Sequence, residues 1–69
     1  MDVNMRKYDR AIIEKDRRYL FCVKNGEPSW HWSLYQAWWD RGNGENARKV
    51  ARIIGGVVRI FNPITGKVR

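Results

Sequence analysis

The stretch ENARKVARIIGGVVRIF, residues 45–61, predicts a helix and a strand separated by two glycines. Its apolar residues recur at the i, i+3, i+4, i+7 spacing of an amphipathic helix, at Ala47, Val50, Ala51 and Ile54. We therefore expect a helix over 45–54. Gly55 and Gly56 are expected to end it, because glycine accommodates the left-handed backbone found at helix C-termini. The β-branched run that follows is typical of a strand.

Beyond this strand, the segment NPITG (62–66) and the final KVR (67–69) complete a predicted C-terminal hairpin. Side chains alternate between the two faces along a strand. This alternation places Val58, Ile60 and Val68 on one face of the hairpin. The opposite face is expected to carry Arg59, Phe61, Lys67 and Arg69.

Towards the N-terminus, the pattern predicts three more strands. Residues 7–15 and 17–24 form two of them, joined near the segment KDR, and the apolar residues on both faces of the second place it centrally in the sheet. Asn25 and Gly26 tolerate the positive φ angles of a type I′ turn and so predict a hairpin leading into a third strand, 27–32. Pro28 lacks a backbone donor, which favours an edge position for this strand.

Ser33 and Gln36 have the spacing of a capping box, which predicts a further helix starting there. It is expected to end near Arg41, before the glycines of 42–44. The order β-β-β-α-α-β-β indicates a small single α+β domain over 7–69, preceded by a flexible N-terminus at 1–6. Its sheet is expected to be mainly antiparallel and covered by two helices.

All four tryptophans lie in WHWSLYQAWWDRG, residues 30–42. A domain of 69 residues without disulfides buries a small share of its surface, so large rings are expected in its core. Trp30 and Trp32 share one face of the third strand, and Trp38 lies on the inward stripe of the following helix. For Trp39 two alternatives stay open, a half-buried cover of the core or an exposed contact.

The net charge of +7 is concentrated in residues 46–69, which contain six basic and no acidic side chains. Such a basic segment is expected to bind phosphate or an acidic surface, although a net charge also keeps small domains soluble. The single Cys22 cannot form an internal disulfide, which favours a reducing, cytoplasmic location. The apolar runs are too short for a membrane span.

No sequence motif for catalysis is found. His31 is the only histidine and Cys22 lies in an apolar strand, where the thiolate is disfavoured, so we expect no enzyme activity. His31 is expected to point away from its tryptophan neighbours. Nucleotide, calcium and zinc motifs are absent, and the expectation is no cofactor and no metal.

Two helices followed by a hairpin, residues 33–69, resemble in topology the second half of a winged-helix module, which implies nucleic-acid binding. The expected function is nucleic-acid binding, DNA in particular, by a basic helix and hairpin. The alternative is an interaction module or small inhibitor that docks a basic and aromatic face on an acidic protein. A chain of this size also suits an accessory protein of a phage or mobile element, either a monomer or a weak homodimer pairing near Pro28. The candidate contacts are Arg48, Lys49, Arg52, Arg59, Lys67 and Arg69, with Tyr35, Trp39 and Phe61 as aromatic contacts.

Overall fold

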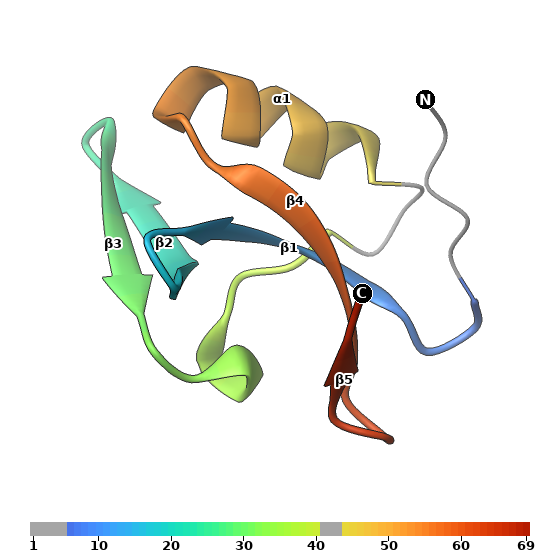
Figure 1. Ribbon diagram of the computed structural model, residues 1–69. Coiled ribbons are helices and arrows are strands. Elements are labelled where there is room, and N and C mark those ends of the chain that lie inside the picture. The colour runs from blue at the N-terminus through green and yellow to red at the C-terminus, as the bar shows by residue number, and fades with distance from the viewer. Residues whose placement is uncertain (1–5, 41–43) are drawn as a thin grey trace.

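The computed structural model describes residues 6–40 and 44–69. In these residues the elements follow one another along the chain as β1 (Arg10–Lys15), β2 (Arg18–Lys24), β3 (Glu27–His31), the 3-10 turn η1 (Leu34–Gln36), α1 (Glu45–Ile54), β4 (Val57–Asn62) and β5 (Lys67–Val68). The strands form one antiparallel sheet in the order β3-β2-β1-β4-β5. Helix α1 lies across β4 and β1 on one face of this sheet (Figure 1).

The strand predictions are confirmed in most details. Asn25 and Gly26 both have positive φ, as a type I′ turn requires, and connect β2 to β3. β3 carries Pro28 and is an edge strand, as expected. Strand β2 is an interior strand between β3 and β1, as expected, but β1 is the middle strand and the more buried one, whereas Leu20 is the single fully buried residue of β2.

Two apolar clusters lie on opposite faces of the sheet, because successive side chains of β1 point to opposite sides. The helix-side cluster joins Ala47 and Ala51 of α1 to side chains of the sheet, namely Ala11, Ile13, Leu20 and Ile60. The second cluster, here called the Phe61 cluster, consists of Ile12, Ala37 and Phe61. Both faces of the central strand are therefore covered.

The predicted helix over 45–54 is confirmed, and both of its ends are capped. Gly55 ends it with a φ of 83° and donates its N–H to the Ala51 carbonyl at 2.8 Å. At the start, the buried carboxylate of Asp40 accepts the N–H groups of Asn46 and Ala47 at 3.0 and 3.2 Å. Asp40 thus takes the capping role that normally belongs to the side chain of the N-cap residue, which here is Gly44.

The prediction of a second helix after Ser33 is wrong. The chain forms the short turn η1 there and becomes extended at Ala37, where φ is −67° and ψ is 138°. The N–H of Trp38 donates to the Leu20 carbonyl at 2.7 Å, and that of Asp40 to the Ala11 carbonyl at 2.9 Å. Residues 37–40 are therefore tied to β2 and β1 by backbone hydrogen bonds.

The two adjacent tryptophans explain why this segment is extended. Trp38 packs on the helix-side cluster, whereas Trp39 packs on the Phe61 cluster. Neighbouring side chains reach opposite faces of a sheet in extended backbone but not in a helix. Without a first helix, the resemblance to a winged-helix module does not hold. The predicted helix end near Arg41 and most of the N-terminal segment 1–6 lie outside the described residues.

The tryptophan predictions are correct in part. Trp30 and Trp38 are half-buried against the helix-side cluster. Trp39 is half-buried too, which decides its open alternatives in favour of a cover. Trp32 is 78% exposed, so its expected place in the core is wrong. The reason is that β3 ends at His31, and the alternation along the strand does not extend to the next residue.

Gly56 leads into β4 at a point of close approach between β4 and β1. A Cβ atom there would overlap Cγ2 of Ile13 and lie 3.2 Å from the carbonyl oxygen of Glu14. We expect Gly56→Ala to lower the free energy of unfolding by about 1 to 3 kcal/mol, as overpacking does elsewhere. Denaturant unfolding followed by circular dichroism measures this loss. An unchanged midpoint would show that β4 shifts away from β1 at no cost.

Candidate nucleic-acid interface

The six basic residues predicted as contacts do not form one surface. Lys49 and Arg52 are exposed on the outer side of α1, and Arg48 is half-buried on the same helix. Arg59 lies opposite Ile12 in the β1–β4 register, on the face away from α1, and its Nε is 2.9 Å from a carboxylate oxygen of Glu14. Arg59 is therefore separated from the helix by the sheet.

Lys67 and Arg69 lie on the helix side of the sheet, not with Arg59 and Phe61 as expected. Lys67 is paired with Asn62, and Arg69 exchanges two backbone hydrogen bonds with Ile60 at 2.9 and 3.0 Å. Directly paired residues of antiparallel strands share a face. The side chain of Ile60 belongs to the helix-side cluster, so those of Arg69 and Lys67 lie on that side as well.

The aromatic candidates also differ in position. Phe61 is fully buried, so the prediction of Phe61 as a surface contact is wrong: its ring fills the core beside Ile12. Tyr35 is 62% exposed, donates its hydroxyl to the Pro63 carbonyl at 3.3 Å and meets Phe61 edge to face at 5.1 Å. Tyr35 is thus accessible but anchored to the β4–β5 turn.

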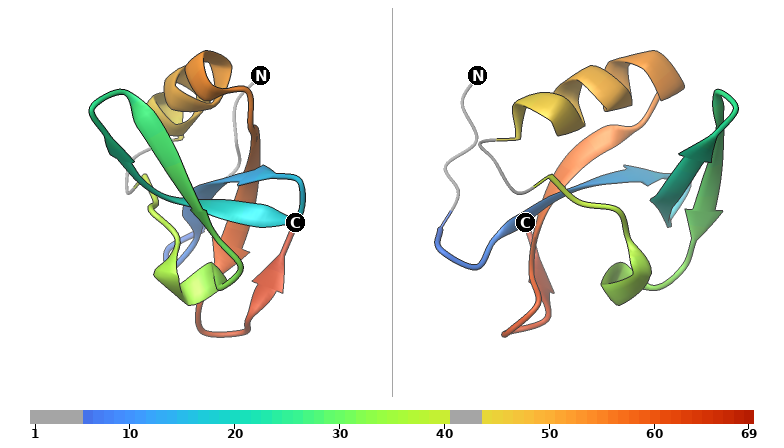
Figure 2. Two further views of the ribbon diagram at one scale, coloured as in Figure 1. Left: turned by 90° about the vertical axis from the view of Figure 1, so that its left-hand side faces the viewer. Right: turned by 180° about the vertical axis from the view of Figure 1, so that it is seen from behind.

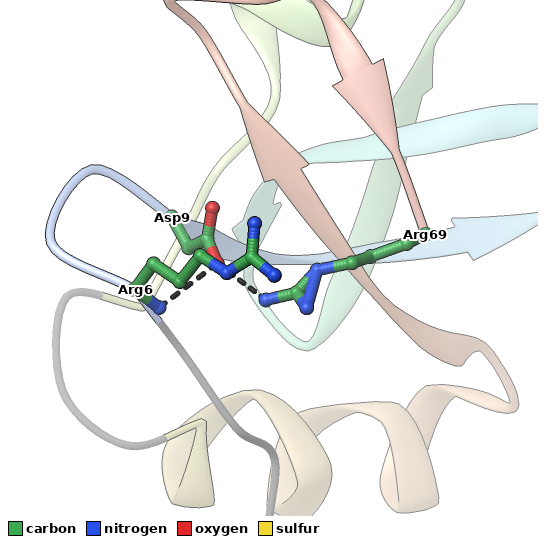
Figure 3. Close-up of polar contacts among 3 residues, drawn as sticks. All are labelled: Arg6, Asp9 and Arg69. Atoms are coloured by element: carbon green, nitrogen blue, oxygen red, sulfur yellow. Dashed lines mark hydrogen bonds and ion pairs between the residues drawn. The ribbon is translucent and has the colours of Figure 1, made fainter.

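The buried carboxylate of Asp9 binds one arginine from each end of the described chain. Asp9 accepts the backbone N–H of Arg6 at 2.9 Å and forms an ion pair with the guanidinium of Arg69. The side chains of Arg6 and Arg69 extend toward each other beside this carboxylate (Figure 3). The hydrogen bond from Arg6, assisted by the charge of Arg69, outweighs desolvation and lowers the pKa of Asp9.

Two adjacent pockets open around Asp9, which lines both of them. The first, here called the Arg69 pocket, has a volume of about 320 Å³ and includes Arg6, Lys67 and Arg69 in its wall. The second, the Trp39 pocket, measures about 370 Å³ and is lined by Lys7, Tyr8, Asp9, Arg10, Trp39, Pro63 and Ile64. Residues 6–9, the end of β5 and the start of α1 lie toward the same end of the molecule (Figures 1 and 2).

Cations and aromatic rings are paired in the Trp39 pocket. The guanidinium carbon of Arg10 lies 4.5 Å from the centre of the Trp39 ring, and Nζ of Lys7 lies 5.4 Å from that of Tyr8. Both separations are within the range of cation–π contacts. Tyr8 is 54% exposed, so its ring remains accessible from solvent.

Sequence reasoning missed Arg6, Lys7, Tyr8 and Arg10, because the charges of residues 1–45 are nearly balanced as a whole. The available signal was local: the run RKYDR, residues 6–10, holds three basic side chains and one acidic one around a tyrosine. The antiparallel pairing of β1 with β4 brings this run beside the C-terminal hairpin.

His31 lies on the opposite face of the sheet from Trp30, as expected, but it does not point away from Trp32. Its ring stacks on Trp32 with centroids 5.4 Å apart and lies 6.0 Å from Phe21. Its Nδ1 accepts the backbone N–H of Ser33 at 3.0 Å. These contacts tie the His31 ring to Trp32 and Ser33, the two residues that follow β3.

No model of a protein family, no curated protein and no solved structure matches the chain. Within residues 6–40 and 44–69, no group of three or more histidine, cysteine and acidic side chains is arranged to hold a metal ion. No helix of this part of the chain has the length and apolar character needed to cross a membrane.

The lowered pKa of Asp9 predicts a defined loss of stability in acid. A carboxyl group with a folded-state pKa below its usual 3.8 stabilises the fold at higher pH, and this contribution is lost as the pH falls through the folded-state value. We expect the thermal unfolding midpoint to fall below about pH 4. Asp9→Asn should show a smaller fall and a lower midpoint at neutral pH, while the exposed Asp16→Asn should follow the parent protein. Identical pH profiles for Asp9→Asn and the parent would contradict this role.

Proposed function

We propose that this protein is a small non-enzymatic nucleic-acid-binding protein, with DNA as its expected ligand. The observation that carries the proposal is that five basic residues line the two pockets that share Asp9. They are Arg6, Lys7, Arg10, Lys67 and Arg69. The acidic side chain in both pocket walls is Asp9, whose charge is offset by Arg69. A polyanion is the natural partner of such a surface.

The basic side of α1 lies on the face of the sheet that carries the Arg69 pocket, whereas the Trp39 pocket opens on the other face, where Arg10 is paired with Phe61. Lys49 and Arg52 are exposed on the helix, which lies on the same face of the sheet as Lys67 and Arg69. Lysine and arginine contacts to phosphates supply affinity and orientation without reading the base sequence. We therefore expect binding with little sequence preference. Arg59 is not counted with these residues, because it lines neither pocket and its guanidinium is paired with Glu14.

The proposal is tested by fluorescence anisotropy with a short labelled duplex and a single strand of equal length, over a series of salt concentrations. We expect Lys49→Glu/Arg52→Glu to weaken binding by about tenfold or more at low salt. For the duplex, the slope of log affinity against log salt should become shallower by about 0.9 for each phosphate that the variant no longer neutralises.

The matched control is Arg18→Glu/Lys24→Glu, two exposed positions of β2. Both double variants lower the net charge from +7 to +3, since each replacement removes two charge units. The control should bind nearly as well as the parent protein. Equal losses of affinity in both variants would show that net charge alone, and not the position of the basic residues, determines binding. Absence of binding by the parent protein would refute the proposal.

A second candidate function is docking on an acidic partner protein. It is supported by exposed rings beside the edge strand β3, where Phe21 is 45% and Trp32 is 78% exposed. Aromatic residues commonly dominate the energetics of protein interfaces. An interface centred on these rings would lose less affinity with salt than phosphate binding does, and Trp32→Ala would weaken it.

A further inference from the structure

We infer that the Trp39 pocket accepts an unpaired base of a single-stranded nucleic acid, while the Arg69 pocket, which shares Asp9 with it, holds a phosphate of the same strand. This inference rests on the proposed function and goes beyond it in naming the form of the ligand. It also assigns a binding role to Tyr8, which lies outside the basic helix and hairpin.

Tyr8 provides the stacking surface for a base. Its ring is 54% exposed and forms part of the pocket wall, together with the apolar side chains of Pro63 and Ile64. Stacking on an exposed aromatic ring is the usual way in which proteins hold unpaired bases, because every base has a flat π face. The pocket thus offers an exposed ring and apolar side chains to the flat face of a base.

Arg10 provides a second planar group beside the base. Its guanidinium is held over the Trp39 ring at 4.5 Å, and Arg10 itself is half-buried. This cation–π contact limits the rotamers of the long side chain before a ligand arrives. Arginine planes stack on bases, and their N–H groups bind phosphate, so a fixed Arg10 serves both purposes.

The second pocket supplies the path for the backbone of the strand. The Arg69 pocket adjoins the Trp39 pocket at Asp9 and is lined by Arg6, Lys67 and Arg69. Asp9 does not repel a phosphate strongly, because its carboxylate is buried and already bound by Arg6 and Arg69. A strand that leaves the Trp39 pocket past Asp9 therefore meets the cations of the Arg69 pocket.

The volume of the Trp39 pocket and its exposed ring favour a single strand over the alternatives. About 370 Å³ falls within the size range of small-ligand sites, whereas the bases of a duplex are stacked inside it and cannot enter a pocket without flipping. An acidic peptide would satisfy Lys7 and Arg10, but its carboxylate side chains have no aromatic face to stack on Tyr8. The combination of ring and cation is met by an unpaired nucleotide.

The test compares Tyr8→Ala and Tyr8→Phe in anisotropy titrations with a labelled oligothymidylate and a labelled duplex of equal length. Tyr8→Ala should weaken binding of the single strand by roughly tenfold, the effect of losing one stacked base. Tyr8→Phe retains the ring and should bind like the parent protein. Duplex affinity should stay nearly constant in both variants. Trp32→Ala removes another exposed ring, one that does not line the pocket, and is the matched control.

The outcomes separate this inference from the proposed function. If the parent protein binds neither oligonucleotide, the proposed function fails. If it binds and Tyr8→Ala changes nothing, lowers both affinities equally, or has a smaller effect than Trp32→Ala, nucleic-acid binding stands and the base pocket is refuted. Thermal unfolding of each variant tests whether the fold is retained, which is expected because the Tyr8 side chain is 54% exposed.

Discussion

Phe61→Ala is expected to lower the free energy of unfolding by about 3 to 5 kcal/mol. Phe61 is fully buried, packs with Ile12 and Ala37, and meets Tyr35 edge to face. Its truncation leaves a cavity on the face of the sheet opposite α1. Since small domains have total stabilities of about 5 kcal/mol or little more, the variant should be largely unfolded.

Urea unfolding followed by far-ultraviolet circular dichroism measures this loss. Ile64→Ala is the control, because Ile64 lies in the nearby β4–β5 turn and is 69% exposed. It should change the stability by less than about 0.5 kcal/mol. A folded Phe61→Ala protein with a nearly unchanged midpoint would mean that the Phe61 cluster contributes little to the fold.

Trp38→Ala is expected to cost about 3 to 5 kcal/mol as well. Trp38 is half-buried in the helix-side cluster, and its extended backbone is bonded to Leu20. Loss of the indole removes the packing that holds residues 37–40 against the sheet. Differential scanning calorimetry should show a lower unfolding temperature and a smaller enthalpy.

Trp32→Ala is the matched comparison for Trp38→Ala, since it removes the same side chain from an exposed position. Its effect should lie within about 0.5 kcal/mol. The ring is stacked on His31, so a small loss is compatible with the structure. Similar losses in the two variants would contradict the assignment of Trp38 to the core and Trp32 to the surface.

The elements that could be predicted from sequence are those determined by local signals. The hairpin turn at Asn25 and Gly26 requires positive φ, and the helix over 45–54 is defined by its apolar spacing and by Gly55. The segment after Ser33 has an equally clear local signal, the capping box, yet it forms only the short turn η1 and is extended from Ala37. Its conformation is determined by hydrogen bonds to Leu20 and Ala11, which are distant in sequence.

The candidate site could be predicted in composition but not in arrangement. Lys49 and Arg52 follow from the helical spacing, and both are exposed as expected. The faces of Lys67 and Arg69 depend on the register across the β4–β5 turn, which residue types do not determine. The contribution of residues 6–10 depends on the pairing of β1 with β4, a contact between the two ends of the described chain.

The capping of α1 by Asp40 has a consequence for how the protein folds. Asp40 is held in place by its own backbone bond to Ala11, so the helix gains its N-terminal cap only after the segment before it has docked on β1. A ten-residue helix is marginal by itself in water. Helix α1 therefore does not act as an early, independent nucleus, and the domain is expected to fold slowly for its length, through contacts of long sequence separation.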